Sequence, residues 1–253
     1  MDIKEQALFL ENRHPWETAR FLFFNRLLSS HIPWFRSNST RSALDVGSGD
    51  GWFAEKLMQA TPAFSSMLCW DTAYSTAQLE AAAPLRVSKI RSRPEGRFDL
   101  LLLMDVLEHI EKDHDFLHGL VSDNLKETGY VLISVPAWNC LYSEHDRFLG
   151  HFRRYSFRST KSLIESSGLK ILHAGGVFHA LLLPRVFCVL REHARKTHNP
   201  SGMVGVAQWK HGVRTTNLVN FLLSCDNAMS LLFAKTGWRV PGLSGWVLCQ
   251  KRP

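Results

Sequence analysis

Short apolar runs alternate with amphipathic helical patterns along most of the chain. A short apolar run bounded by turn residues is typical of a buried strand, whereas apolar residues spaced three and four apart indicate a helix that faces a core. Strands that alternate with helices favour a doubly wound parallel sheet with helices on both faces. The predicted strands are residues 42–46, 66–70, 85–89, 98–104, 129–135, 169–174 and 245–251, and the predicted helices are residues 16–30, 52–60, 74–82, 112–125 and 158–167.

Residues 175–244 interrupt this alternation, because the interval is too long to be a connection between neighbouring strands. It contains an apolar helical pattern near residues 177–195 and an amphipathic one near residues 214–235, separated by a polar loop near residues 197–205. Together with the N-terminal helix, these helices are predicted to cover a ligand pocket. Ordinary packing or a dimer contact through the same helices is the alternative.

A glycine-rich loop follows the first predicted strand, with Gly47, Gly49 and Gly51 directly before the helix at 52–60. Glycines allow a sharp turn and a close approach of the backbone to a ligand. The N-terminus of the following helix adds free N–H groups and the positive end of the helix dipole. These features predict a nucleotide-type pocket at the carboxyl end of the parallel strands.

The loop differs from the dinucleotide-binding fingerprint, because Trp52 stands where that motif has its last glycine, and the lysine of a phosphate-binding P-loop is absent. The remaining pattern, Asp-x-Gly-x-Gly-x-Gly starting at Asp45, resembles motif I of the class I S-adenosylmethionine (SAM) methyltransferases. By this resemblance Asp45 organises the loop near the methionine end of SAM. The residues that would line the methionine and the ribose are Gly47, Ser48, Gly49 and Gly51.

Asp71 ends the second predicted strand. A carboxylate at that place can accept hydrogen bonds from both hydroxyls of a ribose. We therefore predict that Asp71 binds the cofactor, with a simple helix cap as the alternative.

The fourth predicted strand runs into the sequence Asp-Val-Leu-Glu-His-Ile at residues 105–110. This run resembles the corresponding motif of small-molecule methyltransferases, including the O-methyltransferases of ubiquinone biosynthesis. The resemblance implies that Asp105 and Val106 lie against SAM and that Glu108 and His109 open the next loop toward the methyl acceptor. Enzymes that methylate the amines of nucleobases carry an (Asp/Asn)-Pro-Pro-aromatic motif here, so its absence argues against DNA amine methylation.

The segment at residues 135–155 resembles the VPA…SEHD…GHxRRY signature of a bacterial class I methyltransferase subfamily, and the resemblance covers nearly the whole chain. It implies an α/β fold with a Rossmann-like, doubly wound sheet of seven strands, mostly parallel with an antiparallel last strand. Residues 1–253 would form one methyltransferase domain, with a helical extension at residues 1–40. Residues 175–244 would form a helical cap inserted before the last strand.

Methyl transfer depends mainly on the alignment of the nucleophile, the methyl group and the sulfur. A hydroxyl acceptor must also lose its proton, and histidine is the natural base near neutral pH. His145 is our first candidate for this base, followed by His151 and His109; each could instead hold the loop in place. The predicted substrate-binding residues are Trp138, Tyr142, Arg153, Arg154 and Tyr155.

Arg153 and Arg154 could bind an acceptor carboxylate or phosphate, or could pin the loop to Glu144 or Asp146. A metal site formed by His145, Asp146 and His151 is conceivable, but a set rich in imidazole suits Mg²⁺ poorly, and we predict no metal. On the N-terminal helix, His14 and Arg20 are further candidates for the pocket.

The net charge of +7 is unevenly distributed, since residues 146–253 hold 16 Lys and Arg against 4 Asp and Glu, whereas residues 1–145 hold 14 against 19. A basic half suits an acidic carrier protein, an anionic membrane surface or nucleic acid; a solvated basic face is the alternative. Five widely spaced cysteines without a C-x-x-C pair argue against a disulfide framework and a structural zinc site.

Residues 1–6 do not resemble the start of a signal peptide, and no apolar run reaches the length of a membrane span. We therefore expect a cytoplasmic protein, peripheral to the membrane if its basic half binds lipid.

These observations predict a SAM-dependent O-methyltransferase that acts on a small hydrophobic or aromatic hydroxyl compound, free or tethered to a carrier or lipid. The alternatives are N- or C-methylation of a similar acceptor, an RNA methyltransferase, and a protein that binds SAM without transferring its methyl group. The basic charge is the main support for RNA, and the missing amine-methylation motif argues against it.

Overall fold

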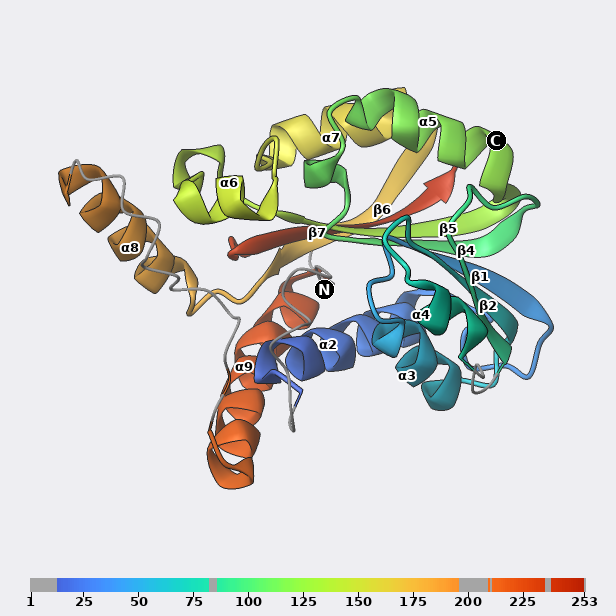
Figure 1. Ribbon diagram of the computed structural model, residues 1–253, viewed down its shortest axis with the longest axis horizontal. Coiled ribbons are helices and arrows are strands. Elements are labelled where there is room, and N and C mark those ends of the chain that lie inside the picture. The colour runs from blue at the N-terminus through green and yellow to red at the C-terminus, as the bar shows by residue number, and fades with distance from the viewer. Residues whose placement is uncertain (1–12, 82–85, 196–208, 210, 235–237, 253) are drawn as a thin grey trace.

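Seven strands form one sheet in the order β3-β2-β1-β4-β5-β7-β6 in the computed structural model, which describes residues 13–81, 86–195, 209, 211–234 and 238–252 (Figure 1). All neighbouring strands are parallel except β7, which is antiparallel to both β5 and β6. The predicted Rossmann-like sheet with an antiparallel last strand is thus confirmed. The strands are β1 (Arg41–Val46), β2 (Phe64–Trp70), β3 (Val87–Ile90), β4 (Phe98–Met104), β5 (Leu125–Pro136), β6 (Leu169–Val177) and β7 (Ser244–Lys251).

Helices cover both faces of the sheet. One face carries α2 (Pro15–His31), α3 (Trp52–Ala60), α4 (Thr76–Glu80) and α9 (Val213–Ala234), and the other carries α5 (Asp113–Asn124) and α7 (Phe157–Ser166) (Figure 1). Each face buries its own apolar core against the strands. Helix α8 (Leu182–Arg195) extends away from the sheet, and no helix in the described part of the chain is long and apolar enough to cross a membrane.

The structure corrects several predicted boundaries. Strand β6 continues to Val177 because its pairing with β7 extends that far, and the helix expected from residue 177 therefore begins only at Leu182. A short helix, α6 (Glu144–Leu149), stands in the segment that was expected to be a loop. Its first turn is fixed by a capping box in which Ser143 and Asp146 exchange hydrogen bonds. The polar loop predicted at 197–205 and the signal-peptide argument on residues 1–6 lie outside the described residues.

Helix α2 contacts the segment between β6 and β7. Pro15 occupies its first turn and the His14 side chain accepts a hydrogen bond from the Trp16 amide, which caps the helix. The Trp16 ring stacks on Phe178 with ring centroids 3.7 Å apart, directly after β6. Helix α2 also packs along α9, so the segment between β6 and β7 rests on the N-terminal helix (Figure 1).

The backbone at the end of β6 contacts the backbone just before β7. A Cβ atom on Gly242 would lie 2.2 Å from the carbonyl oxygen of Val177, and one on Gly176 would lie 2.3 Å from the amide nitrogen of Gly242. Because backbone atoms cannot move aside as a flexible side chain can, only glycine fits at these two positions. This crossing fixes the position of Leu243 and Ser244, which belong to the cavity described below.

We predict that Gly242→Ala lowers the free energy of unfolding by at least about 2 kcal/mol, because the added methyl group forces β6 and β7 apart. Gly245→Ala, in β7, is the matched control, since a Cβ there meets nothing within 4 Å. Urea denaturation of both variants measures the difference. Equal midpoints for the two variants would show that the crossing is not tight.

Candidate active site

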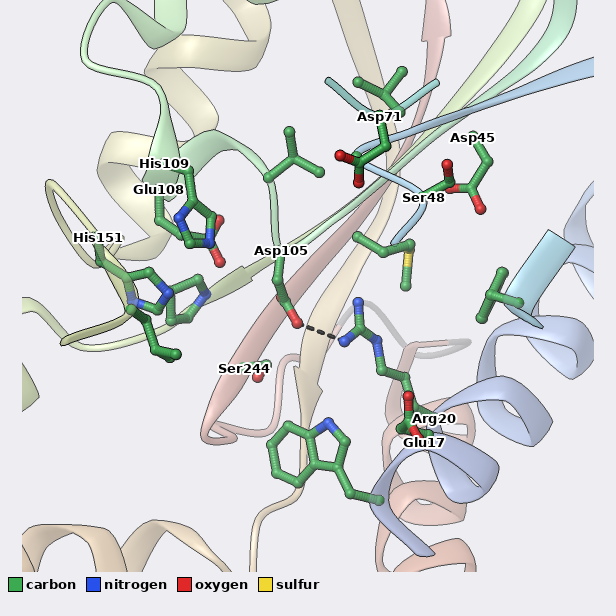
Figure 2. A pocket seen from close by; sticks show the side chains of 18 of the residues that line it. Glu17, Arg20, Asp45, Ser48, Asp71, Asp105, Glu108, His109, His151 and Ser244 are labelled. Atoms are coloured by element: carbon green, nitrogen blue, oxygen red, sulfur yellow. Dashed lines mark hydrogen bonds and ion pairs between the residues drawn. The ribbon is translucent and has the colours of Figure 1, made fainter. Parts of the chain in front are cut away.

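A cavity of about 650 Å³ opens at the carboxyl ends of β1, β2, β4 and β5. It lies where the strand order reverses between β1 and β4, which is the usual ligand site of an open α/β sheet. Helix α2 and the first turn of α8 contribute to its wall. Figure 2 shows two polar ends, with Asp45, Ser48 and Asp71 at one and Glu108, His109 and His151 at the other.

The glycine loop forms the first end. Gly47 has a left-handed backbone with φ +61°, and a Cβ atom there would lie 2.8 Å from Val106 Cγ2. Gly47 and Ser48 line the cavity, as does Val106. Gly49 and Gly51 are not among the lining residues, although both were predicted to contact the cofactor. They shape the loop instead, since Gly51 caps α3 in a left-handed conformation with φ +85°.

Two carboxylates lie beside this loop. Asp71 accepts hydrogen bonds from the amides of Gly49 at 3.0 Å and Ala73 at 2.9 Å, and it lines the cavity. Asp45 is almost completely buried at the end of β1, and burial raises its pKa to about 7. The Ser48 hydroxyl is hydrogen-bonded to the hydroxyl of Tyr74 at 2.7 Å.

Asp105 stands between the two ends of the cavity (Figure 2). Its backbone is left-handed, with φ +58°, a strained conformation that is frequent at functional sites. The carboxylate pairs with Arg20 of α2 at 2.5 Å and accepts a hydrogen bond from the Ser134 hydroxyl at 2.6 Å. Burial alone would raise the pKa of Asp105, but Arg20 and Ser134 hold it below its usual value. Arg20 and His14 both reach the cavity from the N-terminal helix.

The second end of the cavity gathers all three histidines that were predicted to be catalytic. His109 and His151 meet edge to face with ring centroids 4.6 Å apart, and His145 lines the same space. Burial, reinforced by the nearby Arg185, lowers the pKa of His145, so this ring is neutral near pH 7. Glu108 is completely buried, and burial together with the charge of Asp105 raises its pKa well above the usual value.

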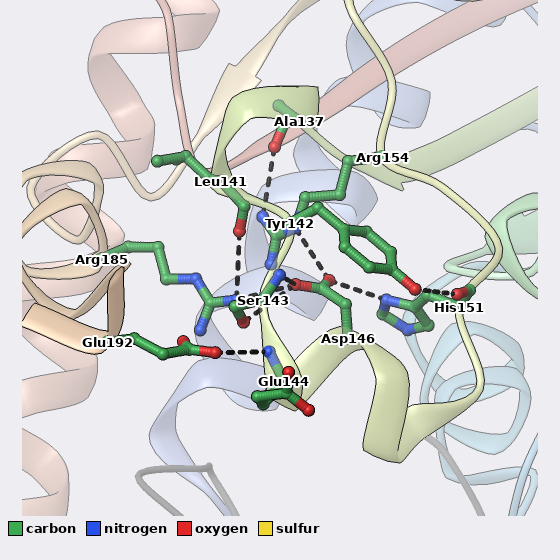
Figure 3. A network of polar contacts seen from close by, with 10 residues as sticks. All are labelled: Ala137, Leu141, Tyr142, Ser143, Glu144, Asp146, His151, Arg154, Arg185 and Glu192. Atoms are coloured by element: carbon green, nitrogen blue, oxygen red, sulfur yellow. Dashed lines mark hydrogen bonds and ion pairs between the residues drawn. The ribbon is translucent and has the colours of Figure 1, made fainter. Parts of the chain in front are cut away.

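Asp146 is the centre of a buried polar network (Figure 3). One carboxylate oxygen accepts hydrogen bonds from His151 Nδ1 at 3.0 Å and Arg154 Nε at 2.8 Å, and the other accepts from Arg185 at 2.8 Å. Although burial opposes the charge of Asp146, His151, Arg154 and Arg185 hold its pKa far below the usual value. Because an ionised carboxylate only accepts, Nδ1 of His151 carries a proton and Nε2 is unprotonated in the neutral ring.

Four of the five predicted substrate-binding residues are not brought to the cavity. Their polar groups bind the protein itself: Trp138 Nε1 donates to the Gly242 carbonyl at 2.8 Å and the Tyr142 hydroxyl donates to the His151 carbonyl at 2.7 Å. Arg153 pairs with Asp113 at 3.2 Å, and the Tyr155 hydroxyl donates to the same carboxylate at 2.7 Å. Only Arg154 lines the cavity, where it also donates to the Ala137 carbonyl.

Sequence reasoning missed Arg185, which lines the cavity and also binds Asp146. The available signal was a charged residue directly after Pro184 inside an otherwise apolar stretch.

Comparison with known proteins decides the family. Residues 16–174 match the model of a methyltransferase domain. The chain belongs to this methyltransferase family. A curated relative, the mitochondrial ubiquinone biosynthesis O-methyltransferase of Schizosaccharomyces pombe, is 30% identical over 105 residues, which are 38% of this chain and 38% of that protein. The chain therefore matches well under half of that relative's length.

Solved structures share the fold. A SAM-dependent methyltransferase from Archaeoglobus fulgidus has a TM-score of 0.50 at 15% identity, covering 91% of this chain and 94% of that one. A SAM-dependent methyltransferase from Mesorhizobium loti reaches 0.52 at 14% identity, covering 89% and 96%. A putative sarcosine dimethylglycine methyltransferase from Galdieria sulphuraria reaches 0.55 at 14% identity, covering 91% and 86%.

The chain thus has a methyltransferase domain, and the glycine-loop end of the cavity fits SAM as the methyl donor. A side chain at Gly47 would fill the loop where the backbone must approach the ligand. Among the described residues each carboxylate oxygen of Asp71 accepts one hydrogen bond, so both can also accept from ribose hydroxyls. Asp45 offers a negative charge for the cationic methionine end, as the family motif implies. SAM supplies an electrophilic methyl group, and these are the residues that would bind and orient it.

We predict that Asp71→Asn weakens SAM binding about 10- to 100-fold, because one charged acceptor of the ribose hydroxyls is lost. The amide keeps the shape of the side chain. Asp123→Asn is the control, as this exposed carboxylate pairs with Arg93 on the surface. Calorimetric titration with SAM measures both, and unchanged affinity in Asp71→Asn would contradict the assignment.

We also predict that SAM binds more tightly as the pH rises toward about 7, because the cationic methionine end favours ionised Asp45. Below that pH the carboxyl is protonated, and its attraction for the cation is lost. Arg20, Asp50 and Asp71 also face Asp45. Asp45→Asn should flatten the dependence between about pH 6 and pH 8. A parent affinity that is constant over this range would refute the prediction.

Proposed function

We propose that this methyltransferase transfers the methyl group of SAM to a hydroxyl group of a small hydrophobic or aromatic acceptor, free or tethered to a carrier or lipid. The supporting observation is that one cavity contains both the glycine loop and the cluster of three histidines. Asp105 lies between these two ends (Figure 2). The methyl group of a SAM molecule bound at the loop would therefore face groups that can take a proton.

His145 is the proposed base. It lines the cavity at the histidine end, and its neutral ring has an acceptor nitrogen near pH 7. The acceptor hydroxyl gives its proton to this nitrogen as its oxygen attacks the methyl carbon. The carbon–sulfur bond then breaks, and its electron pair stays on the sulfur, which becomes a neutral thioether. No acid is needed for this leaving group.

An apolar acceptor is supported by apolar side chains on and next to the cavity wall. Leu181 lines the cavity immediately before α8, and Leu183, Phe187 and Leu190 are largely exposed along the same helix. These side chains form exposed apolar surface on the helix whose first turn lines the site. The resemblance over 105 residues to an O-methyltransferase named for ubiquinone biosynthesis also supports a hydroxyl on a hydrophobic molecule.

The test is turnover of His145→Gln on phenol and catechol acceptors, measured together with SAM affinity. General-base catalysis contributes about 10²- to 10⁴-fold, so we expect kcat to fall at least about 100-fold while SAM affinity changes less than about twofold. His118→Gln, on the exposed side of α5, is the control.

Unchanged turnover in His145→Gln would remove this residue as the base. Methylation of amine or carbon acceptors alone, or of RNA with steeply salt-dependent binding, would replace O-methylation by that activity. Retained SAM without any methylated product would indicate a protein that binds SAM for another purpose.

A further inference from the structure

Glu108 has an environment that the transfer of a methyl group does not explain. Its carboxylate is completely buried, and neither oxygen has a hydrogen-bond partner among the residues that the structure describes. A buried carboxylate without partners is costly, because it loses its hydration and receives nothing in return. A cation bound at this wall of the ligand cavity would give the carboxylate a partner.

Two imidazole rings complete a set of ligands. One nitrogen each of His109 and His151 and one oxygen of Glu108 lie within 4.8 Å of one another, and Figure 2 shows the three side chains converging. Ligand atoms lie about 2.0–2.2 Å from a bound zinc ion, so small side-chain rotations would bring all three to a common ion.

Asp146 prepares His151 for this role. Its hydrogen bond to Nδ1 at 3.0 Å directs the unprotonated Nε2 away from the network as the ligating nitrogen. A carboxylate that orients a histidine in this way is the usual support of a metal-bound imidazole. Asp146 itself is not a ligand, because both its oxygens are already bound by His151, Arg154 and Arg185. The metal set considered from the sequence, which included Asp146, is therefore not the one that the fold assembles.

We propose that Glu108, His109 and His151 bind a divalent transition-metal ion of the zinc class in the acceptor half of the cavity. Two imidazoles and one carboxylate suit zinc, iron, cobalt or manganese and leave coordination positions open, whereas magnesium and calcium prefer sets of oxygen ligands.

The open positions give the ion a role that rests on the proposed function. The acceptor hydroxyl oxygen coordinates the ion, which makes its proton easier to remove. His145 takes the proton, the oxygen forms a bond to the methyl carbon, and the electron pair of the broken carbon–sulfur bond stays on sulfur. The products are the methyl ether and S-adenosylhomocysteine.

The test uses the 253-residue chain after dialysis against a chelator, titrated with Co²⁺ and Zn²⁺ and followed by calorimetry and by the visible absorption of Co²⁺. We expect one ion per chain, with Zn²⁺ displacing Co²⁺. Glu108→Gln and His151→Gln should each weaken binding about 100-fold or more, since changes even outside the ligand shell commonly cost 10- to 100-fold. His145→Gln, in the same cavity but outside the set, should bind the ion as the parent does.

Thermal unfolding separates a lost site from a lost fold. At about one hundred times the dissociation constant, Zn²⁺ should raise the Tm of the parent by about 5–10 °C. Glu108→Gln should show no such rise while unfolding without metal at or above the parent's Tm, because it removes a carboxylate without a partner. Absence of binding, or equal binding by all variants, would overturn the site.

Different experimental results would reject the metal site and the proposed function. Full O-methylation by the metal-free protein would reject the catalytic role of the ion and leave the proposed function standing. Stoichiometric binding that depends on Glu108, without methylation of any hydroxyl acceptor, would support the site and reject the proposed function.

Discussion

One buried carboxylate, that of Asp146, holds the acceptor half of the cavity together. It joins Arg154 from the segment after α6, Arg185 from the cap helix α8, and the ring of His151. Removing such a group would leave the guanidinium groups of Arg154 and Arg185 without their shared carboxylate, and breaking a buried ion pair typically costs about 3–5 kcal/mol. The same contacts fix the tautomer of His151, so stability and the chemical state of the cavity depend on a single side chain.

The two ends of the cavity are formed by different parts of the protein, one mainly by backbone and the other by side chains. The glycine-loop end is formed by the backbone at the carboxyl end of β1. There Gly47, in a left-handed conformation, leaves space for a ligand, and Asp71 holds the loop by accepting a hydrogen bond from the Gly49 amide. The histidine end is a set of side chains brought together from η2 (Leu107–His109), α6 and the segment that follows it. Arg20 reaches Asp105 between them, so the N-terminal helix closes the cavity and is part of the site.

Local patterns predicted the sheet, the glycine loop and the histidine-rich segment, because periodicity and turn chemistry depend on neighbouring residues. The direction in which each side chain of that segment points could not be predicted. Trp138 and Tyr155 are held by Gly242 and Leu107, which are far away in the sequence, and these contacts turn both rings away from the cavity. The unpartnered carboxylate of Glu108 is likewise a consequence of tertiary packing, and the motif around it predicted only its place in the loop.

The central claim is that one cavity holds the methyl donor at its glycine-loop end and the acceptor at its histidine end. A crystal structure of the protein with S-adenosylhomocysteine tests this most directly. The account predicts the ribose on Asp71, the methionine end beside Asp45, and the sulfur open toward His145 and His151. A ligand whose adenosine fills the histidine end, or whose sulfur faces away from these rings, would contradict it.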